Sequence, residues 1–423
     1  MNEITIKQLE KCRLCYNNKL IEIPSLGDQM VINFSELREE RQLFAPLDLV
    51  VCENCGLLQL KYTVSRDAMY KKYWYMSGIS TLMISYLNDI VNSAQRFIKL
   101  NKGDIVIDIG ANDGTLLRQY TIPGLKKVGF EPSELIHYND DNNIIMINDY
   151  FNYVSFRNEF GKDKAKIITS IAMFYDLDDP NHFVEDIKKC LHRDGLWIIQ
   201  MNYLGSMLEN NTFDNISHEH LEYYSLHALK YLLDKHNLKV IRAELNEVNG
   251  GSIRVFITFM NSMLNFSAED LGTVKKILGK EKENNLLSVT TYISYMNKIR
   301  EIGLRLSKFM NKEKTEGKVI AIYGASTRGF VLLQFFKIDS KLISFAVDKN
   351  PEKWGKYIPG TGVKIYNTDI ILERKPDLLL LLPYHLLGEI TVQESKYLVN
   401  GGKILVPLPE PALYSNNGKE VVN

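Results

Sequence analysis

The sequence predicts an α/β fold in which strands and helices alternate around a doubly wound, mostly parallel sheet. Three observations support this class. An apolar run at 105–109 ends in a glycine-rich turn and passes directly into a helical pattern from Thr115, the order of a buried strand, a tight turn and a helix start. A second apolar run, 127–130, ends on an acidic residue, and the same strand, turn, helix, strand and acid order returns at 318–348. Such alternation places helices on both faces of a sheet.

Length and composition indicate a multidomain globular protein. The chain has 423 residues, 45% hydrophobic and 24% charged, enough for two or three cores and unlike a disordered or fibrous chain. Lys+Arg and Asp+Glu balance at 51 each, so no net field attracts nucleic acid or anionic lipid. The stretch MNEITIKQLEKC lacks a basic-then-apolar signal pattern, and apolar runs such as 378–382 are too short to span a bilayer. We expect a cytoplasmic monomer or homodimer with neither nucleic acid nor membrane as partner.

Two C-x-x-C pairs lie in the N-terminal part of the chain, Cys12 with Cys15 and Cys52 with Cys55. Each pair can place two thiolates on one tetrahedral ion from a single turn, and Gly56 suits the left-handed residue of such a turn. A reducing cytoplasm opposes two disulfides, and a redox C-x-x-C needs no duplicate. The sequence therefore predicts a structural Zn²⁺ with four sulfur ligands and no open position for catalysis.

An aromatic cluster at 70–75, with Tyr75 at its end, precedes Ser77, Gly78 and an amphipathic helix at about 81–100. Such a cluster can be a packing plug between domains or a lid over a pocket. Both interpretations remain open for this segment.

The first strand-turn-helix unit predicts a nucleoside cofactor. Glu131 ends the second strand about twenty residues after the first, where a carboxylate can accept both ribose hydroxyls. The alternative is an ordinary α/β crossover, in which the glycines serve only to form the turn and no cofactor binds. Between Gly110 and Gly114 lie Asn112 and Asp113, which put an acid and an amide where a dinucleotide would place its phosphates. This chemistry disfavours NAD and suits a cationic ligand without phosphate.

These residues resemble the class I S-adenosylmethionine (SAM) methyltransferases, whose first two motifs are similar to DIGANDG and GFEPS. The resemblance implies a Rossmann-like sheet, and further strands are expected at 143–147, 166–170, 195–201, 239–245 and 252–258, the last two forming a hairpin. It also implies that Asp149 meets the adenine amine and that the backbone near Ser170 flanks the sulfonium. The cofactor-binding residues expected on this basis are Asp108, Gly110, Asn112, Gly114, Glu131, Pro132, Asp149 and Ser170.

The most unusual polar cluster runs from Asp214 to His220 (DNISHEH) and ends in His218-Glu219-His220. The two histidines lack the i, i+4 spacing of a zinc-protease helix, and no third ligand is near in sequence, so a metal site is disfavoured. A solvated lead-in to the next helix is the simpler alternative. Because the cluster follows the fifth strand, we expect it at the carboxyl edge of the sheet, where a histidine beside a carboxylate can act as a general base.

At this cluster the resemblance narrows to the sugar C-methyltransferases of deoxysugar biosynthesis, which act on nucleotide-linked 4-keto-hexoses at carbon 3. It covers the paired C-x-x-C motifs, the SAM motifs, the H-E-H segment, NGGSIR at 249–254 and YGAS at 323–326. The resemblance implies that Glu219 and His220 form the catalytic pair. The chain departs from the family pattern at Ser217, where a Tyr is common, and at Tyr175, where a His is common.

The remaining chain predicts a helical connector at 267–316, with apolar positions consistent with one long helix, and a second strand-turn-helix-strand-acid unit at 318–348. This C-terminal Rossmann-like lobe could bind a second nucleotide or shape the substrate crevice, and the resemblance favours the second role. The expected domains are a zinc module at 1–68, a SAM-binding domain at 69–263, and connector plus substrate-binding lobe at 264–423.

We therefore expect SAM-dependent C-methylation of a nucleotide-activated keto-deoxysugar, in surface-polysaccharide or natural-product biosynthesis. His220, polarised by Glu219, would remove a proton beside the ketone, and the enolate would attack the methyl group. Alternatives are a sugar O-methyltransferase, an NAD(P)-using redox or epimerising enzyme, and a binding protein for sugar nucleotides. The expected catalytic residues are His220, Glu219, His218 and Tyr224. The expected substrate-binding residues are Tyr75, Asn202, Tyr223, Arg254, Tyr323, Ser326, Arg328 and His385.

Overall fold

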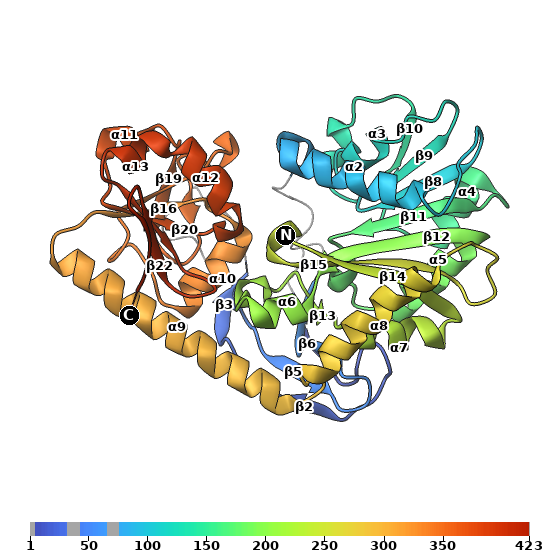
Figure 1. Cartoon of the computed structure of the whole chain (residues 1–423), viewed down its shortest axis with the longest axis horizontal. Coiled ribbons are helices and arrows are strands. Elements are labelled where there is room, and N and C mark those ends of the chain that lie inside the picture. The colour runs from blue at the N-terminus through green and yellow to red at the C-terminus, as the bar shows by residue number, and fades with distance from the viewer. Residues whose placement is uncertain (1–4, 32–42, 66–75, 423) are drawn as a thin grey trace.

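A computed structural model describes residues 5–31, 43–65 and 76–422. Figure 1 shows three parts, with the central sheet and the C-terminal lobe side by side and the N-terminal module packed beneath them. The long helix α9 (Val289–Thr315) runs along the lower edge from the N-terminal module to the C-terminal lobe. Tyr75 and the rest of the aromatic segment 70–75 lie outside the described residues, so the choice between plug and lid stays open.

The central sheet has seven strands in the order β10-β9-β8-β11-β12-β15-β14. The first five are parallel, and β15 runs antiparallel to both of its neighbours. This is the predicted doubly wound sheet closed by the predicted hairpin. The strands are β8 (Ile105–Ile109), β9 (Lys126–Phe130), β10 (Ile144–Ile147), β11 (Ala165–Ile171), β12 (Leu191–Asn202), β14 (Leu238–Asn246) and β15 (Ser252–Phe259).

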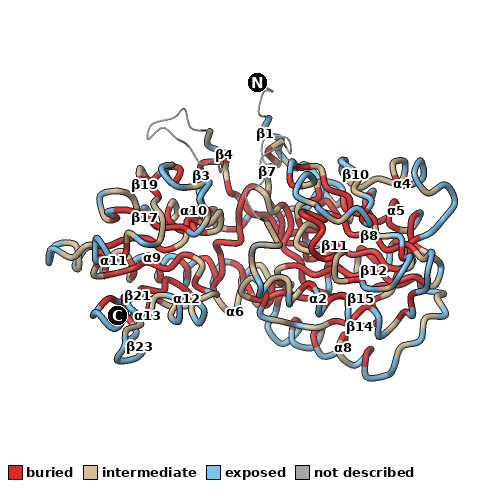
Figure 2. The backbone as a smooth tube through the Cα atoms, turned by 90° about the horizontal axis from the view of Figure 1, so that it is seen from above, coloured by how far each residue is buried: buried red, intermediate tan, exposed pale blue. Residues whose placement is uncertain are grey.

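Both faces of this sheet are covered because its strands carry apolar residues on both sides. Ile105, Ile107 and Ile109 pack in one core, whereas Val106 packs in the other, as the period of two requires. The covering helices are α2 (Thr81–Gln95), α3 (Thr115–Arg118), α4 (Tyr153–Phe160), α5 (Pro180–Cys190), α7 (Leu226–Lys235) and α8 (Ala268–Glu283). Figure 2 shows buried backbone along β8, β11 and β12 and exposed turns at the rim.

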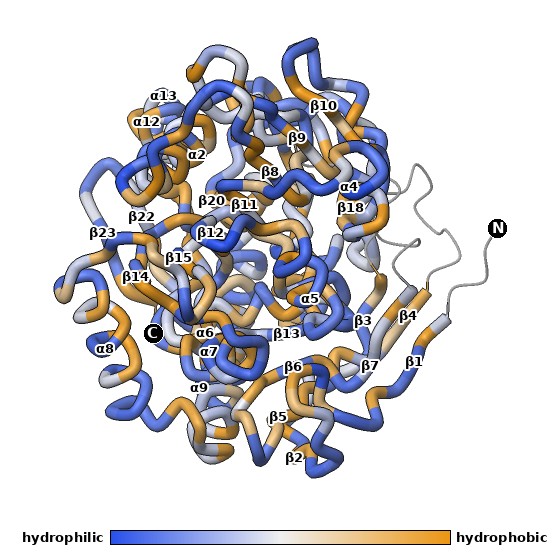
Figure 3. Tube along the Cα trace, turned by 90° about the vertical axis from the view of Figure 1, so that its right-hand side faces the viewer, coloured by the Kyte–Doolittle hydropathy of each residue, from blue (hydrophilic) through white to orange (hydrophobic). Residues whose placement is uncertain are grey.

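The predicted connector is two helices rather than one. α8 packs on β14, and its buried positions Asp270, Val274, Ile277 and Glu281 lie on one face. Figure 3 shows the matching alternation of hydrophobic and hydrophilic stretches along α8. The chain then breaks at 284–288, where Asn285 has a left-handed φ of 51°, and the predicted apolar positions between 292 and 306 face the core from α9.

The C-terminal lobe repeats the parallel arrangement on a smaller scale. Its sheet has the order β18-β19-β17-β16-β20-β21-β22-β23, of which the five strands from β19 to β21 are parallel. Its strands are β16 (Ile320–Tyr323), β17 (Phe345–Val347), β18 (Tyr357–Ile358), β19 (Val363–Tyr366), β20 (Leu378–Leu381), β21 (Lys403–Val406), β22 (Ala412–Ser415) and β23 (Gly418–Val421). Its helices are α10 (Thr327–Phe335), α11 (Ile370–Arg374), α12 (Leu387–Gln393) and α13 (Ser395–Val399).

The N-terminal module is built from short antiparallel strands and takes one strand from the central domain. β13 (Glu222–Tyr223), two residues after His220, pairs antiparallel with β6 in the four-stranded sheet β13-β6-β5-β2. The module therefore touches the predicted catalytic segment directly. Its strands are β1 (Ile6–Gln8), β2 (Leu20–Glu22), β3 (Asp28–Met30), β4 (Phe44–Pro46), β5 (Leu49–Cys52), β6 (Leu58–Leu60) and β7 (Tyr62–Val64).

Among the described residues, no helix is both long and apolar enough to cross a bilayer.

Candidate active site

A cavity of about 550 Å³ lies at the carboxyl ends of the central strands and reaches the C-terminal lobe. The central sheet contributes its first turn and the end of β9, the segment after β12 contributes Glu219 and His220, and the lobe contributes the start of α10. Ligands of open α/β sheets bind at this edge. Three distant parts of the sequence thus share one cavity.

The turn after β8 forms the wall where a nucleoside would lie. Gly110 and Asn112 have left-handed φ angles of 73° and 55°, and both line the cavity with Asp108. The Glu131 carboxylate accepts hydrogen bonds from the backbone N–H groups of Asn112 and Ser133, each at 2.9 Å. These two bonds fix the carboxylate at the strand tip, where it keeps acceptor capacity for a ligand.

The charge of the cavity wall fits a cation better than a phosphate. Its described lining residues include six carboxylates and one guanidinium, that of Arg328. Burial raises the pKa of Asp108 to about 7, with Thr169, which donates a hydrogen bond, acting against the rise. The lining carboxylates are Asp108, Glu131, Asp176, Asp179, Asp186 and Glu219. These acidic side chains suit the positively charged sulfonium and the ribose hydroxyls of SAM, as the residues between Gly110 and Gly114 predicted.

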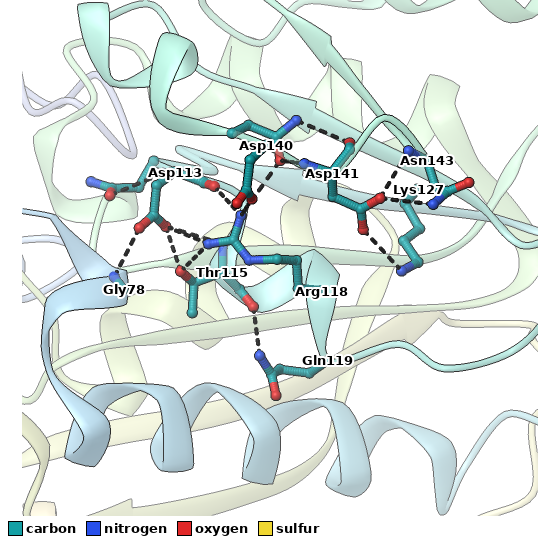
Figure 4. Close-up of polar contacts among 11 residues, drawn as sticks. Gly78, Asp113, Thr115, Arg118, Gln119, Lys127, Asp140, Asp141 and Asn143 are labelled. Carbon is teal, nitrogen blue, oxygen red and sulfur yellow. Dashed lines mark hydrogen bonds and ion pairs between the residues drawn. The ribbon is translucent and has the colours of Figure 1, made fainter.

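Asn112 and Asp113 also hold the segment before α2, and Figure 4 shows the contacts of Asp113. Asp113 accepts hydrogen bonds from the N–H groups of Gly78 (2.9 Å) and Thr115 (3.1 Å), and the Asn112 side chain accepts one from the N–H of Ser77 (3.1 Å). The turn thus binds the 3₁₀ segment η1 (Ser77–Ile79) that leads into α2. This contact brings Ser77 and α2 residues into the cavity wall.

Three of the predicted cofactor residues lie beside the cavity rather than in its wall. Gly114 is the N-cap of α3. Asp149 accepts from the side chains of Asn152 (2.9 Å) and Ser155 (2.8 Å), and Tyr150 and Phe151 line the cavity instead.

Ser170 is buried, and its hydroxyl accepts from the Trp197 indole at 3.1 Å. β11 continues to Ile171, one residue further than predicted, so the wall is formed by Ile171, Ala172 and Met173. Pro132 lines the cavity as predicted.

His220 is a buried base with a defined tautomer. Its Nδ1 lies 2.6 Å from the Asn215 carbonyl oxygen, which can only accept, so Nδ1 carries the hydrogen and the neutral ring keeps its lone pair on Nε2. Burial lowers the pKa of His220 to about 4; the Asn215 carbonyl opposes this, and Arg328 adds to it. The imidazole is therefore neutral at pH 7. Tyr175 contacts the ring edge-on, with centroids 4.4 Å apart.

Glu219 lines the same cavity. Burial raises its pKa to about 7, so a large share of this side chain is protonated near neutral pH. His220 Nδ1 donates its hydrogen to the Asn215 carbonyl. This carbonyl therefore orients the imidazole, a role expected of Glu219 from the sequence.

The other residues expected around the base support it from outside the cavity. His218 is buried and its Nε2 donates to the Ala45 carbonyl at 2.9 Å. The Tyr224 hydroxyl donates to Glu222 (3.2 Å) and the Tyr223 hydroxyl to the His220 carbonyl (2.9 Å). These three side chains do not line the main cavity, whereas Asn202 does.

On the lobe side, Ser326, Arg328 and His385 line the cavity. Arg328 forms two hydrogen bonds with Asp214, at 3.1 and 3.2 Å, and one with the Asn249 carbonyl at 2.6 Å. Burial opposes its charge, but Asp214 raises the pKa of Arg328 above its usual range. This network joins the lobe to the catalytic segment.

Two predicted substrate residues have structural partners elsewhere. Tyr323 donates to Glu394 at 3.1 Å. Arg254 donates to Gln200 and Asp89, each at 2.8 Å, and so ties β15 to α2. Neither side chain lines the cavity.

The second strand-tip acid, Asp348, is closed by a lysine. Like Glu131, it accepts from two backbone N–H groups, those of Ala325 and Asn350, each at 2.8 Å. Unlike Glu131, it also has the Lys353 ammonium at 3.2 Å, and the same ammonium donates to the Ala325 carbonyl. The Asp348 carboxylate is thus already paired with a cation of the same lobe.

The four N-terminal cysteines come together as predicted. All four Sγ atoms lie within 4.8 Å of one another, with Cys12 to Cys55 at 3.5 Å and Cys15 to Cys52 at 3.4 Å. Gly56 has the expected left-handed φ of 70°. Four free thiols at these distances fit a tetrahedral Zn²⁺ with a closed shell.

Sequence reasoning missed several lining residues, including Asn215, Val248, Asn249 and the α2 residues Met83, Tyr86 and Leu87. The α2 positions follow an ordinary helical spacing and resemble core. Asn215 belongs to the same polar cluster as His220, and this closeness in sequence could have identified it as a lining residue.

Three family models match the chain in sequence. One described as "Putative zinc binding domain" matches residues 12–70, one described as "Methyltransferase domain" matches 83–243, and one described as "C-methyltransferase C-terminal domain" matches 247–409. The C-methyltransferase NovU of Streptomyces niveus is 28% identical over 421 residues, which cover 97% of this chain and 98% of that protein.

Solved structures similar to the chain include other methyltransferases. A complex of the Haloferax volcanii Trm112 methyltransferase activator with its methyltransferase gives 15% identity and a TM-score of 0.34, covering 43% of this chain and 94% of that one. The plantazolicin methyltransferase BpumL in complex with SAH gives 13% identity and a TM-score of 0.33, covering 41% and 82%.

The domain matches and the full-length relative agree with the cavity and the cysteine cluster. The chain is a SAM-dependent methyltransferase, similar over nearly its whole length to a C-methyltransferase, with a zinc-binding domain before its methyltransferase domain.

Proposed function

We propose that the enzyme methylates a carbon beside the ketone of a nucleotide-activated keto-deoxysugar, through an enolate. The observation that carries the proposal is the position of His220. A neutral imidazole with Nδ1 fixed and Nε2 unprotonated lies in the same cavity as the Glu131 cofactor wall. Oxygen or nitrogen nucleophiles need less help to lose a proton than a carbon does, so a buried, oriented base suits carbon acid chemistry.

In the proposed reaction, His220 Nε2 removes the proton from the carbon next to the ketone. The C–H electron pair moves into an enolate, and the imidazolium that forms keeps its Nδ1 hydrogen bond to the Asn215 carbonyl. The enolate carbon then forms a bond to the transferred methyl group, while the bond between that methyl and the sulfonium sulfur breaks and its electron pair goes to the sulfur, leaving S-adenosylhomocysteine. When bound, SAM supplies that electrophilic methyl, and Asp108, Asn112 and Glu131 are the residues that would bind it.

Glu219 is proposed as the hydrogen-bond donor to the enolate oxygen. Negative charge develops on this oxygen, and its stabilisation is usually the largest electrostatic demand of such a step. Burial raises the pKa of Glu219 to about 7, which keeps a proton on the acid, and a neutral carboxylic acid can donate where a carboxylate cannot.

The nucleotide-sugar assignment is supported by the C-terminal lobe. Ser326, Arg328 and His385 contribute to the cavity wall, and Asp348 is already neutralised by Lys353, which argues against NAD(P) in the lobe. We propose the domain limits 1–68, 69–263 and 264–423, with the substrate bound between the second and third domains.

Hydrogen exchange tests the proposal. With S-adenosylhomocysteine and a nucleotide-linked 4-keto-6-deoxyhexose in deuterated water, the enzyme should exchange one carbon-bound hydrogen without methylation. His220→Asn should slow this exchange by about 10²–10⁴-fold if the imidazole is an ordinary general base. A product with methyl on a sugar oxygen and no loss of a carbon-bound hydrogen would contradict carbon methylation and leave the fold and cofactor site unchanged.

A further inference from the structure

We infer that Asn215 contacts the substrate: its side-chain oxygen accepts a hydrogen bond from a sugar hydroxyl beside the reacting carbon. The inference rests on the proposed function and makes it more specific. It requires that the sugar still carries a hydroxyl next to the site of proton removal.

Only one of the two polar atoms of the Asn215 side chain has a hydrogen-bond partner. The residue is only 2% exposed, and its Nδ2 donates to the Thr212 hydroxyl at 3.3 Å. Its Oδ1 is buried and has no hydrogen-bond partner, yet the residue lines the cavity together with Glu219 and His220. A buried carbonyl without a partner is costly, and a ligand donor is the usual way in which such a group at a site is satisfied.

The backbone of Asn215 is tied to the base. Its carbonyl accepts from His220 Nδ1 at 2.6 Å, so the residue that orients the base also lines the same cavity. The segment η4 (Phe213–Asn215) is fixed by the Asp214 pair with Arg328 and by the Tyr384 hydroxyl, which donates to Asp214 at 2.7 Å. Oδ1 is therefore a preorganised acceptor rather than a mobile one.

The three groups together match one arrangement of substrate atoms. Oδ1 of Asn215 accepts from a hydroxyl, Nε2 of His220 takes a proton from carbon, and the protonated Glu219 donates to a ketone oxygen. A hydroxyl, an acidic C–H and a ketone oxygen of this kind lie on adjacent carbons of a hydroxy-ketone. A keto-sugar that lacks this hydroxyl would leave Oδ1 unpaired on binding, which is how a polar site rejects a deoxy analogue.

Asn215→Ala tests the inference, with Asn211→Gly as the matched control. Asn211 is also 2% exposed with an unpartnered Oδ1, but it lies outside this cavity, and glycine suits its φ of 55°. The substrates are a nucleotide-linked 4-keto-6-deoxyhexose and its analogue without the hydroxyl beside the reacting carbon. Thermal unfolding with S-adenosylhomocysteine bound is measured in parallel.

We expect Asn215→Ala to lower kcat/KM for the hydroxylated sugar by roughly 10- to 100-fold, the loss of one buried hydrogen bond to substrate. The deoxy analogue should be a poor substrate for the wild type and should show little further loss with the variant. Asn211→Gly should leave the ratio between the two sugars unchanged, and Asn215→Ala should not lower Tm in the absence of sugar.

Equal losses on both sugars, or a drop in Tm that explains the lost activity, would overturn the assignment and make Asn215 a structural residue. A wild-type enzyme that neither exchanges nor methylates the keto-sugar would instead overturn the proposed function, because it fails before any Asn215 variant is compared.

Discussion

At the scale of single residues, burial sets the protonation states that the chemistry needs. Two neighbours in the sequence are shifted in opposite directions: burial lowers the pKa of His220 to about 4 and raises that of Glu219 to about 7. The same desolvation acts on both, because it disfavours the charged form of each. One cavity thus holds a neutral imidazole beside a carboxyl group that is partly protonated near neutral pH.

This opposition predicts the pH dependence of kcat/KM. Activity should fall as pH drops through about 4, where His220 becomes protonated, and fall again as pH rises through about 7, where Glu219 loses its proton. Glu219→Gln keeps a donor without a titrating proton, so it should remove the alkaline limb and leave the acidic limb in place. Retention of the alkaline limb in the variant would exclude Glu219 as the donor.

Glu131 gives a second prediction at this scale. Glu131→Ala should weaken SAM binding by about 1.5–3 kcal/mol, the range for hydrogen bonds to a charged acceptor. The variant also leaves the N–H groups of Asn112 and Ser133 without their acceptor. Glu131→Gln, which keeps one acceptor oxygen, is the control and should lose less. Isothermal calorimetry measures both, and unchanged affinity in Glu131→Ala would refute the ribose assignment.

The residues that sequence placed in the cavity are those set by a short motif. Asp108, Gly110 and Glu131 follow from the strand-turn-helix-strand spacing, and Glu219 with His220 from one polar cluster. Residues whose place depends on where a strand ends were displaced: β11 runs to Ile171, so the wall begins one residue after Ser170. Side-chain partners such as Ala45 for His218 come from another part of the chain, and no local pattern reveals them.

At the scale of elements, the zinc module supports the catalytic segment. β13 completes the module's sheet by pairing with β6, more than 150 residues earlier in the chain, and His218 donates to the Ala45 carbonyl next to it. On the other side, the Asn181 amide donates to the carbonyls of Arg13 and Leu14, inside the first C-x-x-C turn, at 2.8 and 3.0 Å. Sequence predicted the zinc site but not this pairing, because strand partners so distant leave no periodic signal.

Metal removal should therefore disturb the catalytic segment. The purified protein should contain about one zinc per chain, since metal binding by such modules is folding energy. Chelation should speed amide hydrogen exchange in 216–223 while the exchange of β8 and β11 stays slow.

Cys52→Ser should reproduce the effect of chelation, and Cys190→Ser, at a buried cysteine outside the cluster, serves as its control. Unchanged exchange at 216–223 in metal-free protein would show that the segment stands without the module.

At the scale of the whole molecule, the two sheets, each with five parallel strands, border one cavity but differ in how their strand-tip acids are paired. Each sheet has a glycine turn and an acid at a strand tip, so the sequence was compatible with a nucleotide site in both. Lys353 neutralises Asp348 in the second sheet, whereas no lysine or arginine bonds to Glu131 in the first among the described residues. The two sites differ because Lys353 follows Asp348 by five positions. Only the fold reveals that the Lys353 ammonium reaches that carboxylate.

The joint between the two sheets is a buried ion pair, and it yields the last prediction. Asp214 is almost fully buried, and Arg328 pairs with it across the cavity edge. Asp214→Asn leaves the guanidinium with a neutral partner, and Arg328→Gln leaves a buried carboxylate alone. Each should lower the free energy of unfolding by up to about 3–5 kcal/mol, the cost of an unpaired buried charge.

The double variant Asp214→Asn with Arg328→Gln should lose less than the sum of the single changes, because it leaves neither charge unpaired. Glu316→Gln, in the exposed pair with Lys312 on α9, is the control and should change stability by less than about 1 kcal/mol. Denaturant unfolding measures all four variants. If the single changes add without coupling, the pair does not join the sheets, and the cavity between them must be closed by packing alone.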